Sequence, residues 1–248
     1  MLEDIIQSLF DAKNSKIVDI KELITEGKFY PDDLVIRLTR LDDLIIEYYN
    51  NFAVDDLKKL MIIENIVSLY TSYSGDFTFK DLKPVDLFYL FFQLVEFSTG
   101  EPFYFELEDR KIKFEKDAFC RFDYQNYKME NKQIAINNRL YSPPSMYVQS
   151  LLNTFGIIYS IKNPDLIESI SNGEYNSNWM FFIGNKKLET ADEIANLYYI
   201  YNQDVSEKSK KEIENIISIC EETSKVFLNI DGIKTHLLME NIPSKIIY

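Results

Sequence analysis

The strongest structural signal in this chain is PVDLFYLFFQLVEFSTG, residues 84–100. Proline is tolerated at the first position of a helix and Gly100 is a typical stop, so the sequence predicts a helix over Pro84–Ser98. A buried strand is the alternative, but the run is long for a strand. The helix is apolar on nearly every side, which is typical of a helix central to a fold or to an interface. We therefore expect it to be buried, and Phe91→Ala or Leu94→Ala to cost about 2–5 kcal/mol.

The sequence before this helix predicts three more helices, because apolar residues recur there at spacings of three and four. They are expected over Leu2–Phe10, over Pro31–Tyr48, and from about Asp55 to Ser74-Gly75-Asp76.

After Gly100 the pattern changes, and strands are expected in the middle of the chain. The two clearest are Phe103–Leu107 and Lys111–Glu115, joined at Glu108-Asp109-Arg110. Phe119–Tyr124 and Gln133–Ile136 are further candidate strands. Later segments predict a strand over Phe155–Ile161 and a short helix over Pro164–Ile170. Two longer helices are expected to begin at Thr190 and at Asp204, and the tail from Val226 is ambiguous.

These elements predict a helix-rich α+β fold. N-terminal helices and the central buried helix would pack on a small antiparallel sheet built from residues 102–137, with helices at the C-terminal end. We expect a single domain over 1–248, with 1–99 mainly helical, 100–248 mixing strand and helix, and no clear linker.

Composition and charge exclude several classes of protein. Lys and Arg total 27 against 40 Asp and Glu, a formal charge of -13 that would repel nucleic acid. No basic patch offsets it, so no nucleic-acid partner is expected. The apolar run Val85–Phe97 is shorter than the roughly 20 residues that cross a bilayer, and Met1–Asp4 does not resemble the start of a signal peptide. We therefore expect an intracellular protein with no membrane partner.

The chain offers little for catalysis or for holding a cofactor. It has only two cysteines, Cys120 and Cys220, and one histidine, His236, too few for a disulfide framework or a structural zinc site. Phosphate-binding glycine loops are absent. Adjacent acids such as Asp55 and Asp56 point in different directions on a helix, so they are not assumed to converge. Trp179 is expected in the core rather than at an interface. We therefore expect no catalytic residue, no metal, no cofactor and no small-molecule substrate.

One segment carries a family resemblance. Asp86–Gly100 resembles a stretch shared by the baseplate hub proteins of T-even-type phages, in which an acidic residue opens an aliphatic and aromatic helix that ends in an acidic residue, Ser, one further residue and Gly. Four residues occupy those places, namely Asp86, Glu96, Ser98 and Gly100. The resemblance extends over Phe77–Tyr124. Leu87 and Val95 stand where the family often has Arg, and only Cys120 remains of a cysteine pair.

The resemblance implies a factor that helps to build the phage baseplate hub through transient, non-covalent contacts with hub proteins in the host cell cytoplasm. Such a protein is not an enzyme, and the four motif residues would then be structural. A hub component retained in the virion is the alternative. Two other hypotheses remain: a hydrolase using acids such as Glu106 and Asp109, and a phage or mobile-element protein that acts on an unknown host target.

Overall fold

The computed structural model describes residues 14–107, 110–136, 139–141, 143, 145–146, 222–223 and 225–246. The chain divides into two compact units, the first formed by Met1–Phe122 with Lys225–Tyr248 and the second by Asp123–Ser224. The single domain expected over 1–248 stays a prediction. Several predicted elements lie outside the described residues: the helix over Leu2–Phe10 and the four elements between Phe155 and the helix that begins at Asp204.

The central helix of the first unit is α4 (Pro84–Thr99), which confirms the helix predicted there. Proline occupies its first turn, and Gly100 closes it in the left-handed conformation at φ 77°. Phe91 and Leu94 are completely buried. The ring of Phe92 stacks on Phe103 with centroids 4.8 Å apart. The length of the apolar run and its two boundary residues are local signals, which is why the sequence located this helix correctly.

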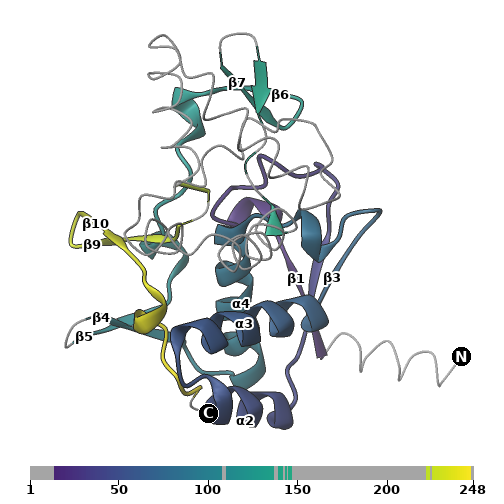
Figure 1. Cartoon of the computed structure of the whole chain (residues 1–248). Coiled ribbons are helices and arrows are strands. Elements are labelled where there is room, and N and C mark those ends of the chain that lie inside the picture. Colours follow the sequence, from purple (N-terminus) through teal and green to yellow (C-terminus); the bar gives the residue numbers. More distant parts are fainter. Residues whose placement is uncertain are drawn as a thin grey trace, which may run out of the picture. The chain divides into compact units, whose positions relative to one another are not determined.

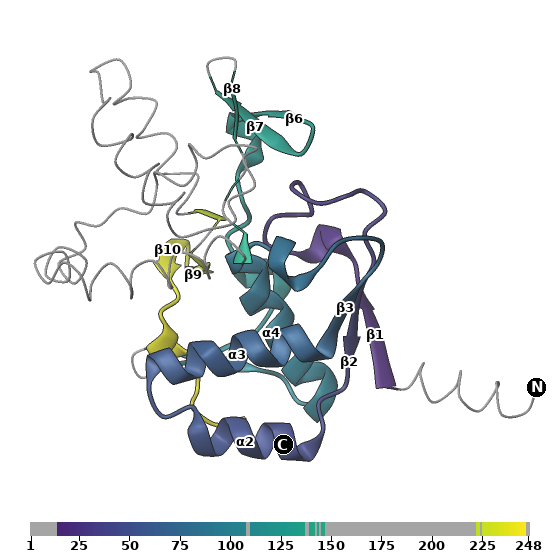
Figure 2. The same ribbon diagram turned by 45° about the vertical axis from the view of Figure 1, so that its right-hand side comes forward.

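Two further helices pack beside α4, namely α2 (Asp43–Phe52) and α3 (Asp56–Tyr70). They lie side by side, and α4 runs across them (Figure 1 and Figure 2). Asp42 and Asp55 cap them by accepting hydrogen bonds from the backbone N–H groups two to three residues into each helix. The helix predicted to begin near Asp55 is therefore confirmed, but it ends at Tyr70 because the next residues join a sheet.

That sheet contains three antiparallel strands in the order β1 (Ser15–Val18), β2 (Ile36–Thr39), β3 (Thr71–Tyr73). The helix predicted over Pro31–Tyr48 is wrong for residues 31–42, and only its last part, Asp43–Tyr48, is helical, as the start of α2. Residues 31–34 form a turn, in which the N–H of Leu34 donates to the carbonyl of Pro31, and strand β2 follows. Alternate residues of β2 are buried while both strand edges are paired, and this long-range pairing outweighs the helical spacing of the apolar residues.

The residues after α4 form hairpins and a second small sheet. Strands β4 (Tyr104–Leu107) and β5 (Arg110–Lys113) pair as the sequence predicted. The other strands are β6 (Lys128–Glu130), β7 (Gln133–Ile136) and β8 (Arg139–Tyr141), which form a sheet in the second unit, and the hairpin β9 (Phe227–Ile230) with β10 (Ile233–His236). The single sheet expected from residues 102–137 is therefore wrong, because its strands belong to two separate sheets. Phe119–Tyr124 is not a strand either, since it contributes one bridge between Phe119 and Leu228.

The predicted helix-rich fold is also wrong. In the described residues there are three α-helices, and the strands β1–β10 form four small antiparallel sheets, one of them within the N-terminal segment expected to be mainly helical. The remaining elements are short 3₁₀ helices: η1 (Ile20–Glu22), η2 (Phe79–Asp81), η3 (Lys116–Ala118), η4 (Tyr124–Asn126) and η6 (Met239–Asn241). Short strands bounded by ordinary residues leave weak local signals, whereas long apolar helices leave strong ones.

Candidate functional site

Asp86, the first residue of the family motif, lies buried in the first turn of α4. Its carboxylate accepts hydrogen bonds from the Thr25 N–H at 3.1 Å, the Thr25 hydroxyl at 2.6 Å and the Tyr30 hydroxyl at 2.5 Å. Tyr30 in turn accepts a hydrogen bond from the backbone N–H of Lys83 at 2.9 Å. This network fixes the loop of residues 23–30 against the N-terminal end of α4.

The electrostatics of this network follow from its burial. Desolvation raises the pKa of Asp86, while the hydrogen bonds from Thr25 and Tyr30 act against that shift. Desolvation also lowers the pKa of Lys83 to about 8, although Asp86 and Asp81 favour its charged form. Perturbed groups of this kind are found at active sites, but also in structural networks. Because Asp86 has no exposed surface, we assign the network a structural role.

The other three motif residues also hold the fold together. Glu96 accepts a hydrogen bond from the Phe103 N–H at 3.0 Å, which turns the chain from α4 towards β4. The Ser98 hydroxyl accepts from the Leu41 N–H at 2.9 Å and donates to the Leu94 carbonyl at 2.6 Å. Gly100 ends α4 as described above. The four motif residues are therefore placed at the two ends of α4 and do not converge on one site.

The remaining candidate residues that the structure describes include His236 and Cys120. The ring of His236 packs on Phe227, with centroids 5.2 Å apart. Burial raises the pKa of the Cys120 thiol, which disfavours the reactive thiolate. Within the described ranges, no group of three or more His, Cys, Asp or Glu side chains is arranged to hold a metal ion. Asp109, Trp179 and Cys220 lie outside the described residues.

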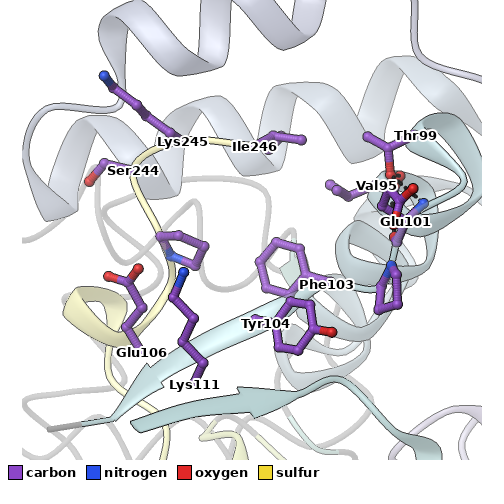
Figure 3. Close-up of a pocket in the computed structure, with 12 residues that line it drawn as sticks. Val95, Thr99, Glu101, Phe103, Tyr104, Glu106, Lys111, Ser244, Lys245 and Ile246 are labelled. Atoms are coloured by element: carbon purple, nitrogen blue, oxygen red, sulfur yellow. Dashed lines mark hydrogen bonds between the residues drawn. The ribbon is translucent and has the colours of Figure 1, made fainter. Parts of the chain in front are cut away.

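A pocket of about 440 Å³ opens between the end of α4, strand β4 and the C-terminal segment (Figure 3). Phe103 and Tyr104 lie in its middle, while Glu106 and Lys111 lie together at one side. Pro243–Ile246 also lines the pocket. The pocket therefore exists because the C-terminal segment lies across this part of the first unit.

The C-terminal segment Met239–Ile246 is held by side chains of α2 and α3 that bind its backbone. The Lys59 ammonium donates to the carbonyls of Met239 at 2.8 Å and Ile242 at 2.7 Å. Tyr49 donates to the Pro243 carbonyl at 2.8 Å. Asn50 binds both backbone groups of Ile246. The inner sides of α2 and α3 are thus fixed to the rest of the first unit.

The outer sides of the same helices leave large apolar side chains in solvent. We define the α2–α3 apolar face by six exposed residues: Leu44, Tyr48, Phe52, Val54, Leu57 and Met61. Leu44 is 75% exposed and Leu57 is 68% exposed. The rings of Tyr48 and Phe52 contact each other with centroids 4.8 Å apart. Clustered apolar side chains on a surface are typical of a site that binds another protein.

The sequence did not distinguish this face from the apolar sides of helices that become buried. Leu57 and Met61 fit the apolar pattern of the third helix, and Tyr48 fits the stripe of the second. One signal was available: α3 carries apolar residues on more than one side, since Leu57, Met61 and Leu69 are exposed while Ile62, Ile63, Ile66 and Val67 are buried. A helix packed on only one side cannot bury all of them.

In comparisons with known proteins, no family model, no curated protein and no solved structure matches this chain. None of the helices among the described residues combines the length and the apolar character needed to cross a bilayer.

Proposed function

We propose that this protein acts by non-covalent contact with other proteins, as an assembly factor of a phage baseplate hub in the host cytoplasm. The α2–α3 apolar face is the observation that supports action by contact. Six large apolar side chains are left in solvent, five of them on two consecutive helices and Val54 in the connection between these helices. Burying them against a partner would remove apolar area from water. The identity of the target rests on the resemblance of the Asp86–Gly100 segment to hub proteins.

The attachment of α2 and α3 favours this function. Asn50, Tyr49 and Lys59 hold the inner sides of the helices, so the outer face is rigid before a partner arrives. A rigid face loses little conformational entropy on binding. The net charge of -13 also keeps a chain with exposed apolar groups from associating with itself.

Co-expression with each hub protein in turn, followed by affinity capture of the full chain, tests the proposal. We expect one hub protein to be captured by the wild type and lost with the double variant Leu44→Ser, Leu57→Ser. Leu69→Ser is the matched control, because Leu69 is 75% exposed near the C-terminal end of α3, eight residues after Met61. Capture of no hub protein would contradict the proposal.

Mass spectrometry of purified virions distinguishes the assembly factor from a hub component that stays in the particle. A transient factor should be missing from virions yet required for hubs to form in infected cells. Stoichiometric copies in the particle would favour the structural component instead.

A further inference from the structure

The charges around the α2–α3 apolar face are almost all of one sign. Four exposed acids flank the apolar residues, namely Asp43, Glu47, Asp55 and Asp56. Lys58, the exposed base among them, forms an ion pair with Asp55 at 3.1 Å. Lys59 is only 3% exposed and binds the C-terminal segment, but its ammonium also lies 3.8 Å from the Asp56 carboxylate. Asp43 and Glu47 therefore contribute most of the negative charge of the rim that a partner can meet. The face is therefore apolar with an acidic rim.

The spacing of the apolar residues favours a helical occupant. Leu44, Tyr48 and Phe52 recur every four residues along α2, which makes the ridge that packs into the groove of a crossing helix. Exposed apolar residues follow α2 along the chain, namely Val54 in the connection to α3, Leu57 in the first turn of α3 and Met61 one turn later. Such a surface fits the apolar side of an amphipathic helix.

The negative charge of the rim favours binding of a different protein over self-association of two copies of this chain through the face. Two copies of this chain meeting through this face would bring their acidic rims together, which costs free energy and slows association. A helix with Lys or Arg on both sides of its apolar stripe would instead pair with the rim. Resting on the function proposed above, we infer that the α2–α3 apolar face docks a basic amphipathic helix of the partner protein.

Three synthetic peptides test this inference with the full chain. The first has Leu and Lys in an amphipathic heptad pattern, the second replaces every Lys by Glu, and the third scrambles the first. Fluorescence anisotropy should show that the Leu/Lys amphipathic peptide binds more tightly than the other two. Its affinity should fall as salt is raised from about 0.05 M to about 0.5 M, because exposed charges are then screened.

Variants locate the binding to this face. Leu44→Ser with Leu57→Ser should weaken binding about tenfold or more, whereas Leu69→Ser should leave it unchanged. Asp43→Asn with Glu47→Gln should weaken it about threefold to tenfold. The matched charge control is Asp33→Asn with Asp76→Asn, which removes two exposed acids from the turn before β2 and the turn after β3 and should have no effect.

Oxidation of Met61 by hydrogen peroxide reports whether the face is open. Mass spectrometry should find rapid sulfoxide formation at Met61 in the chain alone and protection when the Leu/Lys peptide is bound. Slow oxidation in the chain alone would overturn the inference if the chain is monomeric, because a segment of the same chain would then cover the face. Self-association that Leu44→Ser abolishes would overturn it in favour of a second copy.

The remaining outcomes separate this inference from the proposed function. Equal binding of the Leu/Lys, Leu/Glu and scrambled peptides would overturn the inference, and so would unchanged binding of the Leu/Lys peptide to the Asp43→Asn, Glu47→Gln variant. Capture of a hub protein would still support the proposed function in either case. Conversely, specific binding of the Leu/Lys peptide without capture of any hub protein would support the docking surface and reject the hub as its target.

Discussion

The side-chain amide of Asn50 binds both backbone groups of Ile246. Its Nδ2 donates to the Ile246 carbonyl at 3.0 Å, and its Oδ1 accepts from the Ile246 N–H at 2.6 Å. The two residues are 196 positions apart in the chain, so this pair joins α2 to the C-terminal segment in the manner of a sheet ladder. Ile246 is itself buried, so its backbone groups depend on this partner.

Asn50→Ala should lower the free energy of unfolding by about 1–3 kcal/mol, because two hydrogen bonds are lost and partly buried backbone groups stay unpartnered. Urea unfolding measures the change, and hydrogen exchange should show lost protection at the Ile246 N–H. The neighbouring Asn51→Ala is the control, since Asn51 is exposed. Equal stability of the two variants would contradict the role given to Asn50.

Lys59→Met should destabilise the chain by about 2–4 kcal/mol. The methionine keeps the length of the side chain but removes two hydrogen bonds from a charged donor to the carbonyls of Met239 and Ile242. The adjacent Lys58→Met removes only an exposed ion pair with Asp55 and should change stability by less than about 0.5 kcal/mol. Thermal or urea unfolding measures the stability of both variants. A larger loss of stability in Lys58→Met than in Lys59→Met would contradict the role given to Lys59.

Stability should depend on pH through Lys83. Its folded pKa of about 8 lies below the usual value of 10.5, so between these values the unfolded chain binds more protons than the folded chain. The free energy of unfolding therefore rises with pH in this window and loses that contribution as pH falls through about 8.

Measured from pH 8 to about 9.5, this contribution should amount to about 1–2 kcal/mol relative to Lys83→Met. Buried tyrosines such as Tyr49 have a raised pKa and lower the stability as pH rises further, but both proteins contain them, so the difference isolates Lys83. Parallel pH profiles of the two proteins would show that Lys83 is not perturbed.

Two glycines should differ in their tolerance of a methyl group. Gly27 and Gly100 both have positive φ, at 69° and 77°, so an alanine is strained at either position by about 1–2 kcal/mol. A Cβ at Gly27 would also lie 3.0 Å from Ile20, whereas a Cβ at Gly100 meets nothing within 4 Å. Urea unfolding should therefore show that Gly27→Ala costs at least about 1 kcal/mol more than Gly100→Ala. Equal costs would mean that Ile20 moves aside.

The long apolar segment and its boundaries were sufficient to predict α4, and the helical spacing of apolar residues was sufficient to place the start of α3. The β4–β5 hairpin followed from alternation within a few residues. These are local properties, because a helix or a hairpin satisfies most of its own backbone hydrogen bonds. The absence of familiar catalytic motifs could likewise be established from the sequence.

Which apolar residues are buried depends on long-range packing and could not be predicted from local sequence. Leu38 has the helical spacing of a predicted stripe, yet it is buried in β2 because two partner strands, distant in sequence, pair with that segment. Leu57 resembles a core residue in the sequence, yet it is exposed because the C-terminal segment and α4 pack against the other side of α3. Burial is a property of what covers a side chain, and the covering segments here are contributed from distant parts of the chain.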